Sequence, residues 1–502
     1  MNIDHQDLFC KDLPTVPNTG CGKILVTGAS GYIGGRLLPE LVARGYQVRA
    51  MVRGDVQVYQ RKWPEIEVVQ ADALDIISLS AALENIDTAY YLIHSLHLGY
   101  KRFEDADIQA AKNFRKAAEE KQIKRIIYLG GLGDFKAVFS SHLKNRIEVA
   151  TELGSGHIPV TFLRAAIIIG SGSASYEIIH HLVSKSLIIF IPPWAQNWCQ
   201  PISIRDVVKY LVGVLEARET KGESFDLGGP DVLIYEDLLE IFSDILGKRT
   251  NLITLPVPYT GLYSFLASLI TPVPIQITRC LLEGLRDEVI CCDRNKINKY
   301  IRFELLDYRT AVIRALTREE QDKIHTRWSD AYPPAFELAI KLHEISDDLI
   351  YKYEHSISSI KPAPDLFHSI CKVGGNTGWF NTNWMWRIRG IIDRFFFGVG
   401  TVRGRKTYSN LEINDVIDFW RVEDIKENSR LLLRAEMKIP GKAWLEFTIT
   451  RKTDQNRLTI IAHYFTTGLF GKIYWYFFLP FHHIIFADLL QQIEKRAMAS
   501  EG

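Results

Sequence analysis

The sequence predicts an α/β fold with a doubly wound parallel sheet, followed by a smaller α+β domain built on an antiparallel sheet. In the first part of the chain, short apolar segments alternate with helical patterns, which is typical of a parallel sheet with helices on both faces. In the last part, four strand-like segments follow one another and a long helix closes the chain. A chain of 502 residues also exceeds what one hydrophobic core usually covers, so at least two domains are expected.

The alternating elements begin at Lys23, where a short apolar strand runs into a glycine turn. A helical pattern and a second strand follow, which completes one βαβ unit. We expect strands over 23–27, 47–52, 66–70, 88–93, 125–129 and 160–168, and helices over 32–44, 76–84, 103–121 and 140–153. A small substrate lobe is expected at about 171–195 and 230–330. Residues 1–22, which mix acids with prolines, are expected to form a flexible leader.

A second boundary is expected where serine and proline gather, in the stretch SISSIKPAP that ends at Pro364. This boundary gives a first domain over 23–345, a linker over 346–361 and a second domain over 362–498. In the second domain, strands are expected over 415–422, 430–438, 444–451 and 457–465, with a helix over 469–496. An antiparallel meander wrapped on a long helix leaves a cavity between the two layers, so this domain is expected to hold a hydrophobic ligand.

Composition and charge restrict the function. The 60 basic and 59 acidic side chains leave almost no net charge, which argues against capture of nucleic acid. Seven scattered cysteines include no Cys-x-x-Cys pair, so a reduced, cytoplasmic protein is expected. The histidines at 94, 97, 180, 181, 482 and 483 show no metal-binding helical spacing, so no metal is expected. Apolar stretches are too short or interrupted for a membrane span, and residues 473–486 are expected to form a buried or interfacial helix.

The most specific motif is a glycine loop that ends a strand and opens a helix. In this context Gly28 permits a tight turn, Gly31 lets the backbone approach a pyrophosphate, and Gly34 lets the helix pack close to the strand. The helix N-terminus favours the negative charge of the pyrophosphate. The loop therefore predicts a Rossmann-type domain that binds a nicotinamide dinucleotide through Thr27, Gly28, Ser30, Gly31, Tyr32, Ile33 and Gly34.

The residue after the second strand distinguishes the two nicotinamide cofactors. A carboxylate is expected there for NAD, but this chain has Arg53, whose guanidinium suits the 2′-phosphate of NADP. NADP(H) is therefore preferred. NAD(H) is the alternative cofactor, for the case in which Arg53 only faces solvent or Asp55 binds the ribose. Asp72, after the third strand, is placed to receive the adenine amino group, and His94, after the fourth, is counted as a further cofactor contact.

The Thr-Gly-x-x-Gly-x-x-Gly spacing resembles the extended and atypical short-chain dehydrogenases/reductases, close to the NmrA-like and complex I 39-kDa-subunit-like branches. The runs CQPISIRDV at 199–207 and FDLGGP at 225–230 are similar to that family's sheet-to-lobe region, and the resemblance covers about 23–328. Residues 362–497, with GWF at 378–380, DFW at 418–420 and WLEF at 444–447, resemble the DUF2867 domain. That domain is itself similar to the START or SRPBCC ligand-binding superfamily, which implies a helix-grip fold.

The resemblance also implies a catalytic pair, a Tyr and a Lys four residues apart on one helix face. The corresponding helix reads SSHLKNRIE from residue 140 and contains no tyrosine, so His142 and Arg146 occupy the two positions. We expect His142 to exchange a proton near neutral pH and Arg146 to hold ribose hydroxyls. A His142 that only packs or faces solvent is the alternative.

An aromatic cluster and a basic cluster lie near the start of the second domain. The aromatic residues at 379, 380, 384, 386 and 395–397 are typical of a core, although they could line an apolar cavity. The arginines at 387, 389, 394, 403 and 405 fit either a solvated face or peripheral contact with an anionic lipid or membrane. Together with the glycine loop and Arg53, these features favour an NADPH-dependent oxidoreductase for an apolar carbonyl or enone. A small apolar or lipid-like molecule is the expected partner. The alternatives are a non-catalytic NADP(H)-sensing or assembly protein, and a lipid or quinone carrier.

Overall fold

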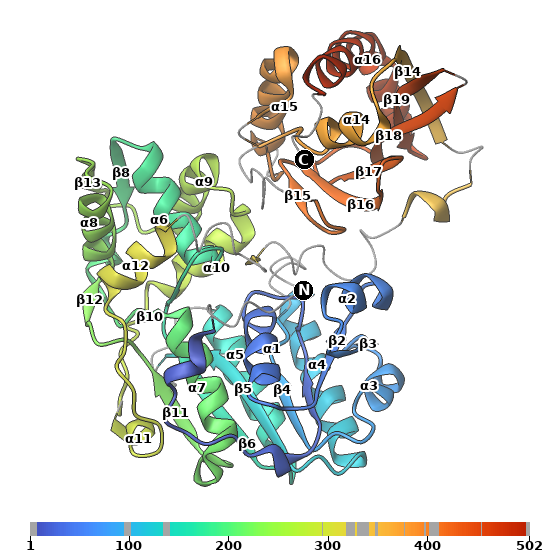
Figure 1. The fold of residues 1–502 in the computed structure, drawn as a ribbon. Helices are drawn as coiled ribbons and strands as arrows, with labels where there is room; N and C mark the ends of the chain where they lie inside the picture. The colour runs from blue at the N-terminus through green and yellow to red at the C-terminus, as the bar shows by residue number, and fades with distance from the viewer. Residues whose placement is uncertain are drawn as a thin grey trace. The chain divides into compact units, whose positions relative to one another are not determined.

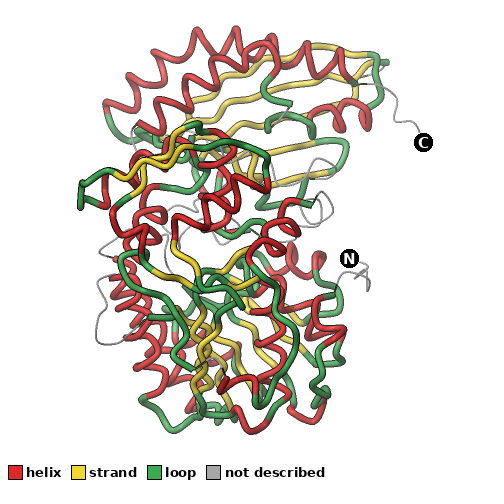
Figure 2. The backbone as a smooth tube through the Cα atoms, turned by 90° about the vertical axis from the view of Figure 1, so that its left-hand side faces the viewer, coloured by secondary structure: helices red, strands yellow, loops and turns green. Residues whose placement is uncertain are grey.

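In the computed structural model the chain forms two compact units, which are described separately. The N-terminal unit comprises Met1–Ala267 and Ile275–Pro334, and the C-terminal unit comprises Ser268–Pro274 and Ala335–Gly502. The structure describes residues 8–94, 102–133, 141–293, 295–317, 327–328, 341–346, 350–375, 377–395, 398–400, 411–452 and 454–497. Figure 1 shows both units, and Figure 2 shows their strands as yellow layers covered by red helices.

The N-terminal unit is built on a seven-stranded sheet in the order β11-β6-β5-β4-β1-β2-β3. All neighbouring strands in this sheet run parallel. The strands are β1 Ile24–Val26, β2 Val48–Val52, β3 Glu67–Gln70, β4 Thr88–Tyr91, β5 Arg125–Gly131, β6 Val160–Ala165 and β11 Ser224–Leu227. The helices around it are α1 Gly34–Ala43, α2 Val56–Lys62, α3 Ile76–Ala82, α4 Arg102–Glu120, α5 Ser141–Gly154 and α7 Ile204–Glu216. The predicted doubly wound parallel sheet is confirmed.

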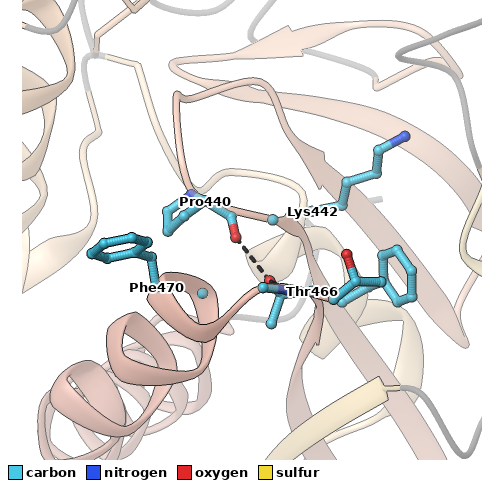
Figure 3. A pocket seen from close by; sticks show the side chains of 9 residues that line it. Pro440, Lys442, Thr466 and Phe470 are labelled. Atoms are coloured by element: carbon cyan, nitrogen blue, oxygen red, sulfur yellow. Dashed lines mark hydrogen bonds between the residues drawn. The ribbon is translucent and has the colours of Figure 1, made fainter.

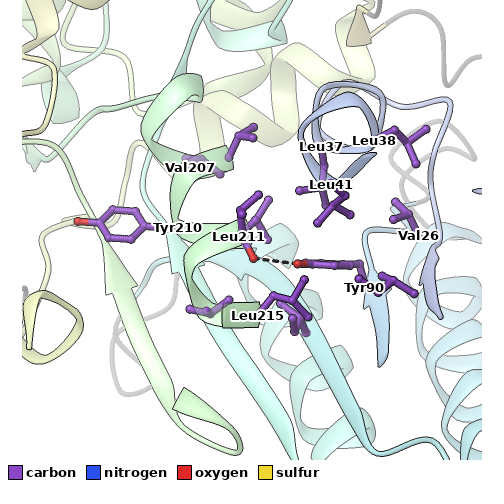
Figure 4. Packing of buried hydrophobic residues seen from close by; sticks show 14 of the residues in the cluster. Val26, Leu37, Leu38, Leu41, Tyr90, Val207, Tyr210, Leu211 and Leu215 are labelled. Atoms are coloured by element: carbon purple, nitrogen blue, oxygen red, sulfur yellow. Dashed lines mark hydrogen bonds between the residues drawn. The ribbon is translucent and has the colours of Figure 1, made fainter. Parts of the chain in front are cut away.

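Both faces of this sheet are buried, because helices cover each of them. Successive side chains of a strand point to opposite faces, and β4 shows the consequence. Tyr90 lies among residues of α1 and α7, and its hydroxyl donates a hydrogen bond of 2.9 Å to the Leu211 carbonyl oxygen (Figure 4). Its neighbour Tyr91 lies in the opposite layer, with its ring centroid 5.0 Å from that of Phe114 in α4. The sheet is therefore a rigid support for the loops at its edges.

The region predicted as a substrate lobe forms a small hydrophobic core of its own. Its helices are α6 Ala174–Lys185, α8 Tyr235–Ile245, α9 Thr260–Ile270, α10 Ile275–Gly284, α11 Asn295–Asn298 and α12 Tyr308–Leu316. Its short strands are β7 Ile168–Ile169, β8 Ile188–Ile191, β9 Trp198–Cys199, β10 Ile202–Ser203, β12 Leu233–Ile234 and β13 Asn251–Thr254. They pair two by two, as β10 with β7, β12 with β9 and β13 with β8. A role in substrate binding stays a prediction.

The expectation of a flexible leader is wrong for the residues that the structure describes between 8 and 22. Two short 3-10 helices, Phe9–Asp12 and Thr19–Cys21, lie in this segment. The backbone N–H groups of Phe9 and Cys10 donate to the two carboxylate oxygens of Glu40, at 2.6 and 3.1 Å. Cys10 and Leu13 are buried in the core beside α1 and α7. The segment is held because it covers apolar surface and satisfies a buried carboxylate.

The C-terminal unit is built on a six-stranded antiparallel sheet in the order β14-β19-β18-β17-β16-β15. Its strands are β14 Ile350–Ser359, β15 Val416–Ile417, β16 Trp420–Lys426, β17 Arg430–Ala435, β18 Lys442–Lys452 and β19 Gln455–Phe465. Three helices accompany it, α14 Ala363–Ile370, α15 Asn383–Phe395 and α16 Leu469–Arg496. The predicted antiparallel meander with a long closing helix is confirmed, and α16 has the predicted bounds.

The expectation of a linker over 346–361 is wrong. Residues 350–359 form β14, which pairs antiparallel with β19 along its whole length. The serines that suggested a loop instead contact the neighbouring strand, since the Arg457 guanidinium donates to the Ser356 hydroxyl at 2.7 Å. Partly buried Tyr351, Tyr353 and Ile357 pack on the core with the period of two that a strand requires.

The helix α16 differs along its length in what it contacts. Leu489, Leu490 and Ile493, in its second half, are fully buried in the core. In its first half, Phe470, Ile473 and several aromatic side chains are exposed. Among the described helices it alone has the length and composition that would allow a membrane crossing, and 28% of its most apolar window is buried.

Candidate functional site

The glycine loop joins the end of β1 to the start of α1, at the carboxyl edge of the parallel sheet. Gly28 has a φ of 61°, and a Cβ there would lie 2.6 Å from the Leu92 carbonyl oxygen beyond β4. A Cβ at Gly34 would overlap the Gly28 carbonyl oxygen, so a side chain would push α1 away from the loop. Both positions therefore require glycine for reasons of conformation and close packing.

Gly31 differs from these two glycines. A Cβ at Gly31 would lie 3.1 Å from the Gly28 carbonyl oxygen and would meet no other atom of the described residues within 4 Å. The Gly31 N–H donates to that same oxygen at 2.9 Å, which closes the turn. The turn lies directly before the N-terminus of α1, and a helix N-terminus favours a pyrophosphate, because the first N–H groups of a helix have no partner within it. The loop thus has the shape that a dinucleotide requires.

Thr27 supports the loop from inside the sheet. It is fully buried, its hydroxyl donates to the Tyr90 carbonyl oxygen at 2.9 Å, and it accepts from the Leu92 N–H at 3.0 Å. Its hydroxyl is therefore used in bonds to Tyr90 and Leu92, and its contact with the cofactor stays a prediction. Ser30, Tyr32 and Ile33 are half-buried, and the Arg36 guanidinium lies 4.1 Å from the centre of the Tyr32 ring.

The residues predicted to contact the adenosine part of the cofactor lie at the carboxyl edge of β2 and β3. Arg53 follows β2 directly and its side chain is exposed. The Asp55 carboxylate accepts from the Gln57 N–H at 2.8 Å and caps α2, so it is already used. Asp72 is half-buried, and its carboxylate accepts from the Leu74 N–H at 2.9 Å. A 2′-phosphate would therefore meet an exposed guanidinium rather than an unoccupied carboxylate.

Two of the predicted site residues meet at a carboxylate that the sequence did not single out. The Asp107 carboxylate, on α4, is 2% exposed. The same oxygen atom, Oδ2, lies 3.3 Å from His94 Nδ1 and 3.4 Å from a terminal nitrogen of Arg146. His94 follows β4, and Arg146 lies on α5. The three side chains come from three elements and form one polar cluster beside the carboxyl ends of β4 and β5.

The burial of Arg146 changes its expected role. Its side chain is buried, and burial lowers the pKa of its guanidinium to about 10, so it stays charged at neutral pH. An ion pair with Asp107 explains this residue without a cofactor, and contact with a ribose stays a prediction. His142 lies on the first turn of α5, and its side chain lies outside the described residues.

The expectation that His180 and His181 have no partner at a metal-binding helical spacing is wrong, because Glu177 lies three and four residues before them on α6. Ligand atoms of these three residues lie within 4.8 Å of one another. His180 is also packed, since its ring stacks on Tyr176 with centroids 5.6 Å apart.

The C-terminal unit contains the cavity expected between sheet and helix. Its volume is about 340 Å³. It is lined mainly by aromatic and aliphatic side chains from α15, α16 and the facing strands, among them Trp384, Ile388, Trp444, Tyr474, Phe478 and Phe481. His463 is one of the few polar lining residues, and its Nε2 lies 2.7 Å from a carboxylate oxygen of Glu446. An apolar molecule with a small polar group suits such a lining.

A second pocket lies where β19 passes into α16 (Figure 3). The Thr466 hydroxyl donates to the Pro440 carbonyl oxygen at 2.9 Å, and this bond holds the turn before the helix. The Phe470 ring stands outside the first turn of α16 and is 81% exposed. This pocket therefore has an apolar rim that no described residue covers.

The arginines of the predicted basic cluster differ in their exposure. Arg394 is buried, and burial lowers the pKa of its guanidinium to about 10. Arg387 is exposed, whereas Arg389 is half-buried and donates to the Lys438 carbonyl oxygen at 3.2 Å. Arg403 and Arg405 lie outside the described residues.

Comparison with known families assigns both units. The NmrA-like family matches residues 21–279, which is more than half of the chain, and the chain therefore belongs to the NmrA-like family. The N-terminal unit accordingly has the NAD(P)-binding fold of the short-chain dehydrogenase/reductase type. Residues 346–489 match the family described as a protein of unknown function, DUF2867.

Individual relatives are distant. The chain is 24% identical over 241 residues to NADH dehydrogenase (ubiquinone) 1 alpha subcomplex subunit 9, mitochondrial, of Arabidopsis thaliana, which covers 46% of this chain and 60% of that protein. It is 28% identical over 119 residues to a 3 beta-hydroxysteroid dehydrogenase/Delta 5→4-isomerase of Mycobacterium tuberculosis, which covers 22% and 32%. Both matches span less than two thirds of the relative. The solved triphenylmethane reductase of Citrobacter sp., complexed with NADP(H), is 21% identical with a TM-score of 0.48, over 59% of this chain and 100% of that one.

Proposed function

We propose that the protein is an NADPH-dependent oxidoreductase that acts on an apolar carbonyl or enone compound. The observation that carries this proposal is the loop around Gly31, which makes a tight turn directly before the N-terminus of α1, with Arg53 exposed at the end of the next strand. Glycines at 28 and 34 give the loop its shape, and the guanidinium gives a preference for the 2′-phosphate. Bound NADPH would supply the hydride.

The residues of the chain have separate tasks in this proposal. Arg53 binds the 2′-phosphate, and the backbone at Gly31 binds the pyrophosphate. His142 donates the proton, and Arg146 gives electrostatic support at the ribose. Asp107 is a positioning residue, because its carboxylate lies 3.4 Å from Arg146 and 3.3 Å from His94. Asp72 binds the adenine amino group. The cytoplasmic location of the protein stays a prediction.

The C-terminal unit holds the apolar substrate or a related lipid-like molecule. Its cavity of about 340 Å³ is in the size range of small-ligand sites, and its lining is mainly aromatic. The steroid substrate in the name of the Mycobacterium tuberculosis relative is consistent with an apolar compound.

Calorimetric titration with NADPH and NADH tests the cofactor assignment. We expect the unmodified protein to bind NADPH more tightly, and Arg53→Ala to lose at least ~10-fold in NADPH affinity with little change for NADH. Arg61→Ala, an exposed arginine at the last turn of α2, is the matched control and should behave as the unmodified protein does. Equal affinities for the two dinucleotides in the unmodified protein would contradict the preference.

A non-catalytic role is the second candidate, favoured by the helix sequence at His142, which has no tyrosine. The Arabidopsis relative is named as a subunit of a larger complex, which fits an assembly or sensing role. NADPH oxidation with a panel of apolar carbonyl compounds separates the two candidates, since a sensor binds NADPH without turnover. A lipid or quinone carrier is the third candidate, and native mass spectrometry would detect its bound ligand.

A further inference from the structure

The helices α15 and α16 are apolar on two sides. In α15 the buried side includes Trp386 and Gly390. The opposite side exposes large apolar residues at spacings of three and four, namely Trp384, Ile388, Ile391, Ile392 and Phe395, with exposed fractions of 45–68%. An apolar stripe at this spacing normally packs against a core, and a helix that is apolar all round is normally covered. The outer stripe of α15 therefore requires an apolar partner.

The first half of α16 repeats this pattern. Trp475 faces the core, and Ile485 and Phe486 follow it on the buried side. The outer side exposes Leu469, Phe470, Ile473, Tyr476, Phe477, Phe481 and Ile484, with exposed fractions of 39–81%. Large side chains of both helices line the same cavity, so the two outer stripes belong to one surface around its mouth. Such a contiguous apolar surface marks an interaction site.

The charges on these helices indicate which kind of partner covers the apolar surface. The outer surface carries exposed Arg387 on α15 and exposed Lys472 on α16. Residues 469–487 contain no acidic side chain, and the one acid of α15, Asp393, is 1% exposed. The whole chain is nearly neutral, so this one-sided charge is local. Aromatic side chains with a few cations are typical of contact with anionic lipid head groups.

A membrane crossing by α16 does not fit the same observations. Leu489, Leu490 and Ile493 are fully buried, so the second half of the helix packs on the sheet. The Ser369 hydroxyl of α14 also donates to the Ile493 carbonyl oxygen at 2.8 Å. The helix is thus fixed along the unit, with its large exposed apolar side chains confined to residues 469–484, as in helices that lie in the interface plane.

We propose that the outer surface of α15 and the first half of α16 docks on the surface of an anionic lipid bilayer, and that the cavity exchanges its apolar ligand with that bilayer. The inference rests on the proposed function only in the nature of the ligand. Docking would bring the cavity mouth to the acyl chains, so that an apolar molecule enters without crossing water.

Vesicle flotation tests this proposal with the full-length protein, without cofactor or substrate. We expect the protein to float with vesicles of equal parts phosphatidylcholine and phosphatidylglycerol, and much less with phosphatidylcholine alone. The double variant Phe470→Ser/Ile473→Ser should lower the partition at least ~10-fold, because both side chains would otherwise be buried in lipid. Arg387→Glu should lower it about tenfold for the anionic vesicles only.

The matched control is Ile360→Ser, which removes an isoleucine that is 81% exposed and lies outside both helices. It should float as the unmodified protein does, and NADPH titration of every variant should be unchanged, which separates this test from that of the cofactor site. An unmodified protein that does not float, or a double variant that floats equally well, would overturn the proposal. A dimer that the double variant converts to a monomer, with no vesicle binding, would also overturn it and assign the surface to a second copy.

Discussion

The imidazole of His482 should make the C-terminal unit sensitive to acid. Its ring lies among aromatic side chains, with centroids 5.2 Å from Trp475 and 5.4 Å from Phe486. Its Nδ1 atom has no hydrogen-bond partner among the described residues. Burial therefore lowers the pKa of His482 from 6.5 to about 4, because the charged form would lose its solvation.

The sign of the effect follows from this depressed pKa. The folded chain keeps His482 neutral, whereas the unfolded chain takes up a proton at its ordinary pKa. The stability linked to this residue is complete above the unfolded pKa of 6.5 and is lost as the pH falls through the folded pKa of about 4. The difference between these pKa values corresponds to a contribution of about 3 kcal/mol from His482 to the free energy of unfolding.

Differential scanning calorimetry of the full-length protein at about pH 7.5 and about pH 4.5 measures this loss. His482→Phe removes the proton site and keeps a ring that can stack on Phe486. We expect acid to lower the unfolding temperature of the C-terminal unit by roughly 5–10 °C more in the unmodified protein than in this variant. His368→Phe, which changes an exposed histidine on α14, should leave the acid sensitivity unchanged. Equal acid sensitivity in the unmodified protein and His482→Phe would refute the reasoning.

Three further predictions concern the N-terminal unit. Burial raises the pKa of Asp206 to about 6. The stabilisation of the folded chain that is linked to this residue is therefore complete below the unfolded pKa near 3.8 and is lost as the pH rises through 6. Asp206→Asn should therefore be more stable than the unmodified protein at about pH 8, by about 3 kcal/mol in chemical unfolding, and similar at about pH 4. Gly28→Ala should abolish NADPH binding in calorimetry, because a Cβ would press on the Leu92 carbonyl oxygen. Asp107→Ala should cost about 3–5 kcal/mol in thermal or chemical unfolding, since it leaves Arg146 buried without this counter-ion.

Local patterns predicted most of the sheets. The strands from β1 to β6 and from β17 to β19 carry apolar runs between turn residues, and their centres lie where the sequence places them. The single strand expected over 415–422 is instead divided between β15 and the start of β16. The glycine loop was found because its spacing falls between a strand and a helix. The structure then adds what spacing cannot give, namely that Gly28 and Gly34 are required for packing, whereas a Cβ at Gly31 would meet only the Gly28 carbonyl oxygen, at 3.1 Å.

The failures have a common physical origin in contacts between distant segments. Residues 8–22 look like a mobile leader by composition, but Glu40 accepts hydrogen bonds from Phe9 and Cys10 and fixes them. The strand β14 is rich in serine and tyrosine, and its identity depends on pairing with β19, about a hundred residues later. Composition records local preference only, and tertiary pairing overrides it.

The same reason explains why the polar cluster around Asp107 could not be predicted. His94 was predicted as a cofactor contact and Arg146 as a ribose anchor, and 52 positions separate them in the sequence. In the fold, one oxygen of Asp107 lies 3.3 and 3.4 Å from their nitrogens, which is longer than the 2.7–2.9 Å typical of a strong charge-assisted bond. If Arg146 acts on a bound ribose, Asp107→Asn must change NADPH affinity as well as stability, whereas a purely structural ion pair would change stability alone.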